Sequence, residues 1–170
     1  MHLPGSYYFS AIDQMLLSSG TAKRLLMASA MGGMVGLERE WRHKASGLRT
    51  NMLICMGCAF FTLLSAVLAG EGNPDKGRVA ANIVQGIGFL GAGLILHTRN
   101  RVLGLTSAAS VFAVASIGMA CGAGRWPSVA VGALITFSVL VFGGPVEHRL
   151  HRWLFPPDGG RTADGRASDH

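Results

Sequence analysis

The stretch that decides the fold is residues 51–70, NMLICMGCAFFTLLSAVLAG, because it contains no Asp, Glu, Lys or Arg. A helix needs about 20 consecutive apolar residues to cross the hydrocarbon core of a bilayer, and this segment supplies that length. Three further stretches are equally free of charge: residues 79–98, 102–124 and 126–146. Four such stretches in a chain of 170 residues predict an all-α, polytopic membrane protein.

The overall composition agrees with a membrane protein. Only 14% of the residues are charged and 49% are hydrophobic, whereas a soluble domain carries roughly 25% charged residues. This balance excludes a disordered chain. The net charge of +6 would indicate a nucleic-acid partner only if the basic residues clustered on a folded surface. They lie between the uncharged stretches instead, so we expect no nucleic-acid partner.

A fifth, shorter apolar segment comprises residues 25–37, between Lys23–Arg24 and Glu38. At about 1.5 Å per residue it extends only about 20 Å, which is less than the roughly 30 Å of the hydrocarbon core. Snorkelling of the flanking basic side chains or local thinning would close the gap, and an in-plane or re-entrant segment is the alternative. We therefore expect a bundle of about five transmembrane helices.

The distribution of basic residues predicts the orientation. With five crossings, ten of the 15 Lys and Arg residues fall on one side of the membrane. Because basic residues accumulate on the cytoplasmic side, we expect the N-terminus outside and the C-terminus in the cytoplasm. Residues 1–21 are expected to form an interfacial segment and residues 22–146 the transmembrane domain. Residues 147–170 are expected to form a short basic cytoplasmic tail that is disordered after residue 156.

Two motifs match known binding sites but lie in the wrong context. The GIGFLG sequence at 86–91 matches the dinucleotide fingerprint, which also needs a preceding strand and an acidic residue about 20 positions later. Cys55 and Cys58 form a C-x-x-C pair within an apolar helix, not at an accessible helix N-terminus. We therefore expect no cofactor, no metal site and no catalytic residue. We interpret the small residues as close-packing helix faces: Gly88, Gly91 and Gly93, the pair Gly32 and Gly36, and the pair Gly118 and Gly122.

Polar side chains within the crossings must find hydrogen-bond partners away from water. Asn82 and Gln85 are three residues apart on one face of the third long stretch, and we expect them to make interhelical hydrogen bonds. Thr106, a further candidate functional residue, opens the next helix and is followed by Ser107 and Ser110. The four long stretches contain no ionisable Asp, Glu, Lys or Arg, which argues against an ion-coupled carrier but leaves carbonyl-lined pores open.

The densest charge pattern is EREWRHKASGLRT at residues 38–50. Glu38 with Arg42, and Glu40 with Lys44, form acid-before-base pairs four residues apart that support a helix. Gly47 is expected to cap this helix in a left-handed conformation. The segment is interpreted either as a helical hairpin with its charges at the lipid headgroups or as a surface that recognises a partner or an anion. Its candidate functional residues are Glu38, Arg39, Arg49 and Thr50.

Three spaced motifs together resemble the transmembrane domain of the MgtC/SapB family. They are GLERE at 36–40 followed by GLRTN at 47–51, RVAANIVQGIGFLGAG at 78–93, and GLTSAAS at 104–110. The resemblance covers about residues 22–142. Relatives typically carry Gln and Ser in the third-helix motif, where this chain has Asn82 and Gln85.

The resemblance implies a bacterial inner-membrane protein, here in a short form without the ACT-like cytosolic domain of longer relatives. Such proteins are often described as magnesium transporters. The best-studied members instead support growth in low magnesium by acting on other membrane proteins, notably by restraining the F-type ATP synthase. We therefore expect a non-enzymatic regulator that docks on a membrane-protein partner, such as ATP synthase, or on itself. The alternative is a transporter or channel for Mg²⁺ or a small solute.

Overall fold

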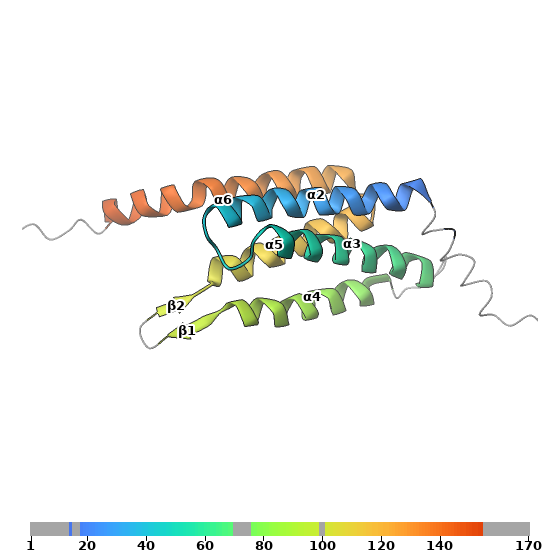
Figure 1. Ribbon diagram of the computed structural model, residues 1–170, viewed down its shortest axis with the longest axis horizontal. Helices are drawn as coiled ribbons and strands as arrows, with labels where there is room; N and C mark the ends of the chain where they lie inside the picture. The colour runs from blue at the N-terminus through green and yellow to red at the C-terminus, as the bar shows by residue number, and fades with distance from the viewer. Residues whose placement is uncertain (1–13, 15–17, 70–75, 99–100, 155–170) are drawn as a thin grey trace, which may run out of the picture.

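Five helices make up most of the computed structural model, which describes residues 14, 18–69, 76–98 and 101–154. They form an elongated bundle in which successive helices run in opposite directions (Figure 1). Their bounds are α2 (Ser19–Trp41), α3 (Leu48–Ala69), α4 (Lys76–Leu94), α5 (Leu105–Gly122) and α6 (Trp126–Leu154). The expectation of an all-α bundle of about five helices is confirmed.

Three of these helices are long and apolar enough to cross a membrane by length and composition. The segments are Leu48–Leu68, Leu105–Gly122 and Trp126–Val146. The helix built around residues 25–37 is longer than its apolar segment, because α2 has 23 residues. At about 1.5 Å per residue the whole helix is about 35 Å long, but its apolar segment keeps the 13 residues 25–37, and α2 is not among the three candidate spans.

The expectation that the uncharged stretch 79–98 is helical throughout is wrong at its C-terminal end. Helix α4 ends at Leu94, and a small hairpin follows, in which β1 (Leu96–Thr98) pairs antiparallel with β2 (Arg101–Leu103). Gly104 joins the hairpin to α5 with a φ of 90°, in the region that favours glycine. A Cβ at Gly104 would also collide with the carbonyl oxygen of Leu94. The chain therefore turns sharply at Gly104, between the hairpin that follows α4 and the start of α5.

The connections gather at the two ends of the bundle (Figure 1). The α2–α3 connection, the β hairpin and the end of α6 lie at one end, and the α5–α6 turn and the start of α2 lie at the other. Helix α6 continues without interruption past residue 146, so the first part of the predicted tail, up to Leu154, is helical. The predicted disorder after residue 156 and nearly all of the predicted N-terminal segment lie outside the described residues.

The core is built where α2, α3 and α5 meet backbone to backbone. A Cβ at Gly32 would collide with the carbonyl oxygen of Asn51 and lie 2.7 Å from Cβ of Cys55. A Cβ at Gly118 of α5 would collide with the carbonyl oxygen of Cys55. Gly36 and Gly122 make equally close approaches to α3. Both predicted glycine pairs therefore pack inside the fold, in agreement with the close-packing interpretation.

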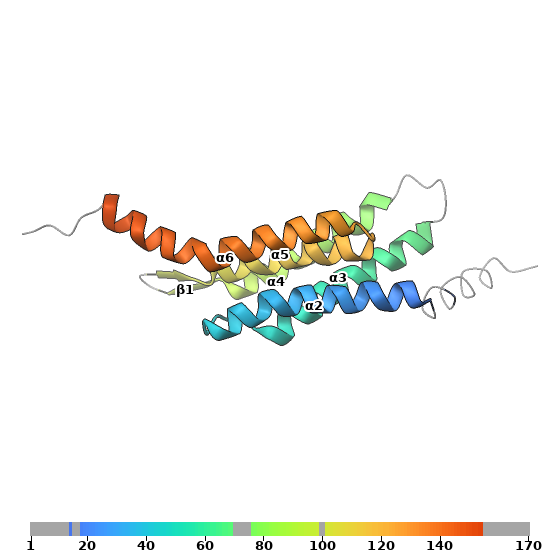
Figure 2. The same ribbon diagram turned by 90° about the horizontal axis from the view of Figure 1, so that it is seen from above.

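Side chains around these glycines are small and buried. The main cluster comprises Ala28, Val35, Cys55, Ala59, Val114, Ile117, Cys121, Val129 and Ala133. All three cysteines are free and buried, as the interpretation of the C-x-x-C pair as packing residues predicts. Figure 2 shows that α6 and α2 diverge toward the end where α6 terminates.

Helix α4 is attached to this core by one face only. Ile83 and Ile87 are buried against Val111 and Ala115 of α5, and a Cβ at Gly91 would make an ordinary contact of 3.7 Å with Ala108. A Cβ at Gly88 or Gly93 would meet no atom within 4 Å. Of the three glycines predicted to pack on this helix, only Gly91 has a neighbour within 4 Å of an added Cβ among the described residues.

The glycine contacts predict opposite effects of the same substitution at two sites. Gly32→Ala or Gly118→Ala forces α3 away and is expected to lower the free energy of unfolding by about 2 kcal/mol, the usual cost of overpacking a core. Gly88→Ala is expected to raise it by up to about 1 kcal/mol, because alanine favours a helix and the added methyl meets open space. Reversible unfolding in mixed micelles, followed by circular dichroism, measures both. Equal effects at Gly32 and Gly88 would contradict the packing described.

Candidate functional site

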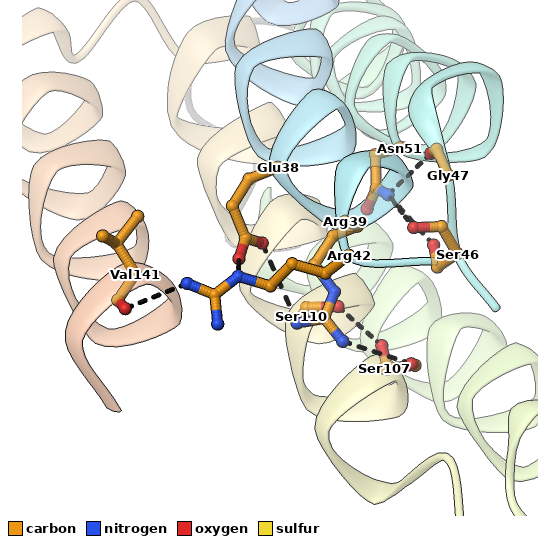
Figure 3. A network of polar contacts seen from close by, with 9 residues as sticks. All are labelled: Glu38, Arg39, Arg42, Ser46, Gly47, Asn51, Ser107, Ser110 and Val141. Atoms are coloured by element: carbon orange, nitrogen blue, oxygen red, sulfur yellow. Dashed lines mark hydrogen bonds and ion pairs between the residues drawn. The ribbon is translucent and has the colours of Figure 1, made fainter. Parts of the chain in front are cut away.

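A buried charge network occupies the last turn of α2 (Figure 3). Glu38 is 8% exposed and Arg39 only 2% exposed. The Glu38 carboxylate lies between two guanidinium groups: Arg42 Nε is 2.6 Å from Oε1, and Arg39 Nη1 is 3.9 Å from Oε2. The predicted pairing of Glu38 with Arg42 is confirmed. The placement of Glu38 and Arg39 on an exposed hairpin is wrong, because the close approach of α2 to α3 and α5 encloses both.

Arg39 connects α2 to the first turns of α5. Its Nη2 donates to Oγ of Ser107 at 3.3 Å, and Oγ of Ser110 donates to the carbonyl oxygen of Ser107 at 2.8 Å. The predicted candidate Thr106 is exposed, whereas Ser107 is buried. The burial of Ser107 could have been predicted from the spacing, because Ser107 shares its helix face with Ser110 and Gly118. Arg39 and Ser107 are therefore the pair that joins these two helices.

Arg42 connects α2 to α6 in a different way. Its Nη2 donates to the carbonyl oxygen of Val141 at 3.0 Å. Pro145 lies inside α6, four residues later, and has no N–H with which to bond that carbonyl. The guanidinium thus supplies the donor that the proline removes. The bend of α6 beyond this point is visible in Figure 2 and has its physical cause in the same proline.

The connection from α2 to α3 is fixed by Asn51 and Glu40. Nδ2 of Asn51, which is fully buried, donates to Ser46 O, Ser46 Oγ and Gly47 O at 2.8–3.0 Å. Oε2 of Glu40 accepts from the backbone N–H of Leu48 at 2.7 Å and so caps α3. The predicted left-handed cap at Gly47 is wrong, because His43 takes that conformation with a φ of 51°.

Two of the predicted hairpin candidates lie outside this network. Arg49 and Thr50 are exposed on the first turn of α3. The buried member of the GLRTN motif is Asn51, which the sequence analysis did not single out. Its neighbours in the motif project away from the bundle, because successive helical residues are rotated by about 100°.

Some buried atoms of the network have no hydrogen-bond partner among the described residues. They are both carboxylate oxygens of Glu38, Arg39 Nε and Asn51 Oδ1; Glu38 Oε1 nevertheless forms the ion pair with Arg42 Nε at 2.6 Å. Leaving such an atom unpaired costs about 1–3 kcal/mol, a cost that the close helix packing must offset. The network is therefore held in place by packing more than by saturated hydrogen bonds.

The amide residues of α4 do not join this network. Asn82 and Gln85 are both exposed, and neither hydrogen-bonds to another helix in the part of the chain that the structure describes. The expected interhelical hydrogen bonds within the chain are therefore wrong. The reason is that α4 packs through Ile83 and Ile87, which leaves Gln85 exposed and places Asn82 at the open groove between α3 and α4.

Because Glu38 neutralises a buried guanidinium, its removal is expected to be costly. We expect Glu38→Gln to lower the free energy of unfolding by about 3 kcal/mol, since one charge of a buried pair is left uncompensated. The matched control is Arg49→Gln, which removes an exposed charge at the same end and is expected to change stability by less than about 0.5 kcal/mol. Unfolding in mixed micelles compares the two. A Glu38→Gln protein as stable as the control would show that the pair is not structural.

The sequence of the chain is similar to those of known proteins over most of its helical part. The model of the MgtC family matches residues 25–149. "Protein MgtC" of Brucella suis biovar 1 (strain 1330) is 44% identical over 119 residues, which cover 70% of this chain and 49% of that protein. "Protein MgtC" of Salmonella typhimurium (strain LT2) is 43% identical over 135 residues, which cover 79% of this chain and 57% of that protein.

The chain thus spans about half the length of the curated relatives it matches. No solved structure matches it. The matched residues include all five helices, from within α2 to within α6, and carry the buried network described above. On this basis, the chain belongs to the MgtC family.

Proposed function

We propose that this chain is a non-enzymatic membrane regulator, which acts by docking the exposed face of α4 against a helix of another membrane protein. The observation that carries the proposal is the exposure of Asn82 and Gln85 on a helix that the family resemblance places in the membrane. An amide facing lipid has no hydrogen-bond partner, so a second helix that supplies one is favoured.

The geometry of this face suits a helix partner. Asn82, Gly86, Phe89 and Gly93 recur at spacings of three and four residues, which places them along one side of α4. A Cβ at Gly86 or Gly93 would meet nothing within 4 Å, so a neighbouring backbone has room to approach. Phe89 is 81% exposed and would fill a recess in the partner. The combination of small residues and amides is typical of interhelical contacts in membranes.

The identity of the partner rests on resemblance. In the family, growth in low magnesium is linked to the restraint of ATP synthase, which makes an ATP synthase membrane subunit the first partner to test. Self-association through the same face is the second. The resemblance implies the bacterial inner membrane, and the distribution of basic residues supports an orientation with the N-terminus outside and the C-terminus in the cytoplasm.

A transporter for Mg²⁺ is the less favoured function. Mg²⁺ prefers carboxylate ligands, and Glu38 is the only buried carboxylate among the described residues. It lies between two guanidinium groups, which repel a divalent cation. Mg²⁺ flux into proteoliposomes that contain this protein alone would favour transport instead.

Site-specific photocrosslinking tests the docking face. We expect a benzophenone amino acid in place of Phe89 to yield one discrete crosslinked product in native membranes. The matched control is the same substitution at Phe142 of α6, which is also exposed, at 65%, and is expected to give no such product. Mass spectrometry identifies the crosslinked protein. Identical products from both positions would contradict a specific role of α4.

A bulky substitution separates docking from folding. Gly86→Ile is expected to reduce the yield of the Phe89 crosslink about tenfold, which corresponds to a loss of roughly 1.4 kcal/mol in docking free energy. The free energy of unfolding is expected to stay within about 1 kcal/mol, because a Cβ there meets only open space. Gly143→Ile on α6, where an added Cβ is 4.0 Å from Val139 Cγ1, is the control and is expected to leave the crosslink intact.

A further inference from the structure

A cavity between α2 and α6 is not explained by the docking face of α4. Its volume is about 560 Å³. The apolar part of its wall comes from Met34, Leu37, Phe137 and Val141, and the charged part comes from Glu38 and Arg42. It lies beside the Val141 carbonyl that Pro145 leaves without a helical donor. The space is open between the two helices, and the described residues do not fill it.

The charge beside the cavity is positive. Glu38 is shared by Arg39 and Arg42, so these three side chains leave one positive charge uncompensated. The surrounding segment does not supply the missing negative charge, since residues 38–49 contain two acidic and four basic side chains. A ligand with a net negative charge therefore complements this site.

Arg42 has hydrogen-bonding capacity to spare. A guanidinium has five N–H donors. The Nε of Arg42 faces Glu38 and its Nη2 donates once to Val141, while its Nη1 has no hydrogen bond among the described residues. The side chain of Arg42 is 40% exposed, so this edge is accessible. Guanidinium groups bind phosphate oxygens through pairs of such donors.

We propose that this cavity binds one phospholipid with a net negative headgroup, of the phosphatidylglycerol type. The phosphate accepts hydrogen bonds from Arg42, and an acyl chain lies along Met34, Leu37 and Phe137. Trp41, which is 85% exposed at the rim, is the residue type that resides at the headgroup level of a bilayer. Basic pockets between transmembrane helices are suited to such headgroups. A free phosphate ion would leave the apolar wall uncovered.

Native mass spectrometry of the purified full chain tests the proposal. Delipidated protein is titrated with dioleoyl phosphatidylglycerol and, separately, with dioleoyl phosphatidylcholine, whose headgroup carries no net charge. We expect one phosphatidylglycerol to bind, at least about tenfold more tightly than phosphatidylcholine. Equal affinities would overturn the proposal. Inorganic phosphate is expected not to displace the lipid, and efficient displacement would point to a simple anion site instead.

Two variants locate the lipid. Arg42→Gln is expected to weaken phosphatidylglycerol binding about tenfold, while Arg149→Gln, which removes an exposed charge from α6, is expected to leave it within about twofold. Val141→Trp fills the cavity but keeps the backbone carbonyl that Arg42 binds, so it is expected to abolish binding even though every charge remains. Unchanged phosphatidylglycerol binding in Val141→Trp would overturn the proposal. This variant keeps the test decisive even if Arg42→Gln does not fold.

Discussion

The packing of α2 and α5 against α3 through glycine is the constraint on which the rest of the structure depends. Gly32 of α2 and Gly118 of α5 both lie against the backbone of α3, at the carbonyls of Asn51 and Cys55. In a bilayer, helices gain little from hydrophobic burial against one another, so such close contact is a main source of association. It also brings the last turn of α2 against the first turns of α5. Arg39 is then enclosed, and its charge requires both Glu38 and the hydroxyl of Ser107.

The two helices outside this central unit carry polar groups that lack a partner within their own helix. Helix α4 leaves Asn82 and Gln85 exposed because its apolar face is already used by Ile83 and Ile87. Helix α6 has a carbonyl without a helical donor because of Pro145, and Arg42 reaches across to bond it. The first feature favours a protein partner, and the second creates a cavity suited to a lipid. Both features lie on helices outside the closely packed unit of α2, α3 and α5.

Much of the fold could be predicted from the sequence, because uncharged length and glycine spacing depend on local sequence alone. The five helices and the glycine pairs of α2 and α5 are examples. The direction in which polar residues face could not be predicted, because it depends on which side of each helix finds a neighbour. Arg39 was expected at the surface and is buried, whereas Asn82 was expected inside and is exposed. The β hairpin was missed because its strands have three residues each and its first strand lies within the uncharged stretch 79–98.

The central claim is that α4 is held by one face and presents its amide-bearing face outward. The most direct measurement is a nitroxide scan along α4, with one protein copy per nanodisc and oxygen collision rates as the readout. We expect a helical period, with the lowest rates at residues 83, 87 and 91 and the highest at 82, 86, 89 and 93. Rates without that period, or lowest at residues 82 and 86, would contradict the arrangement described.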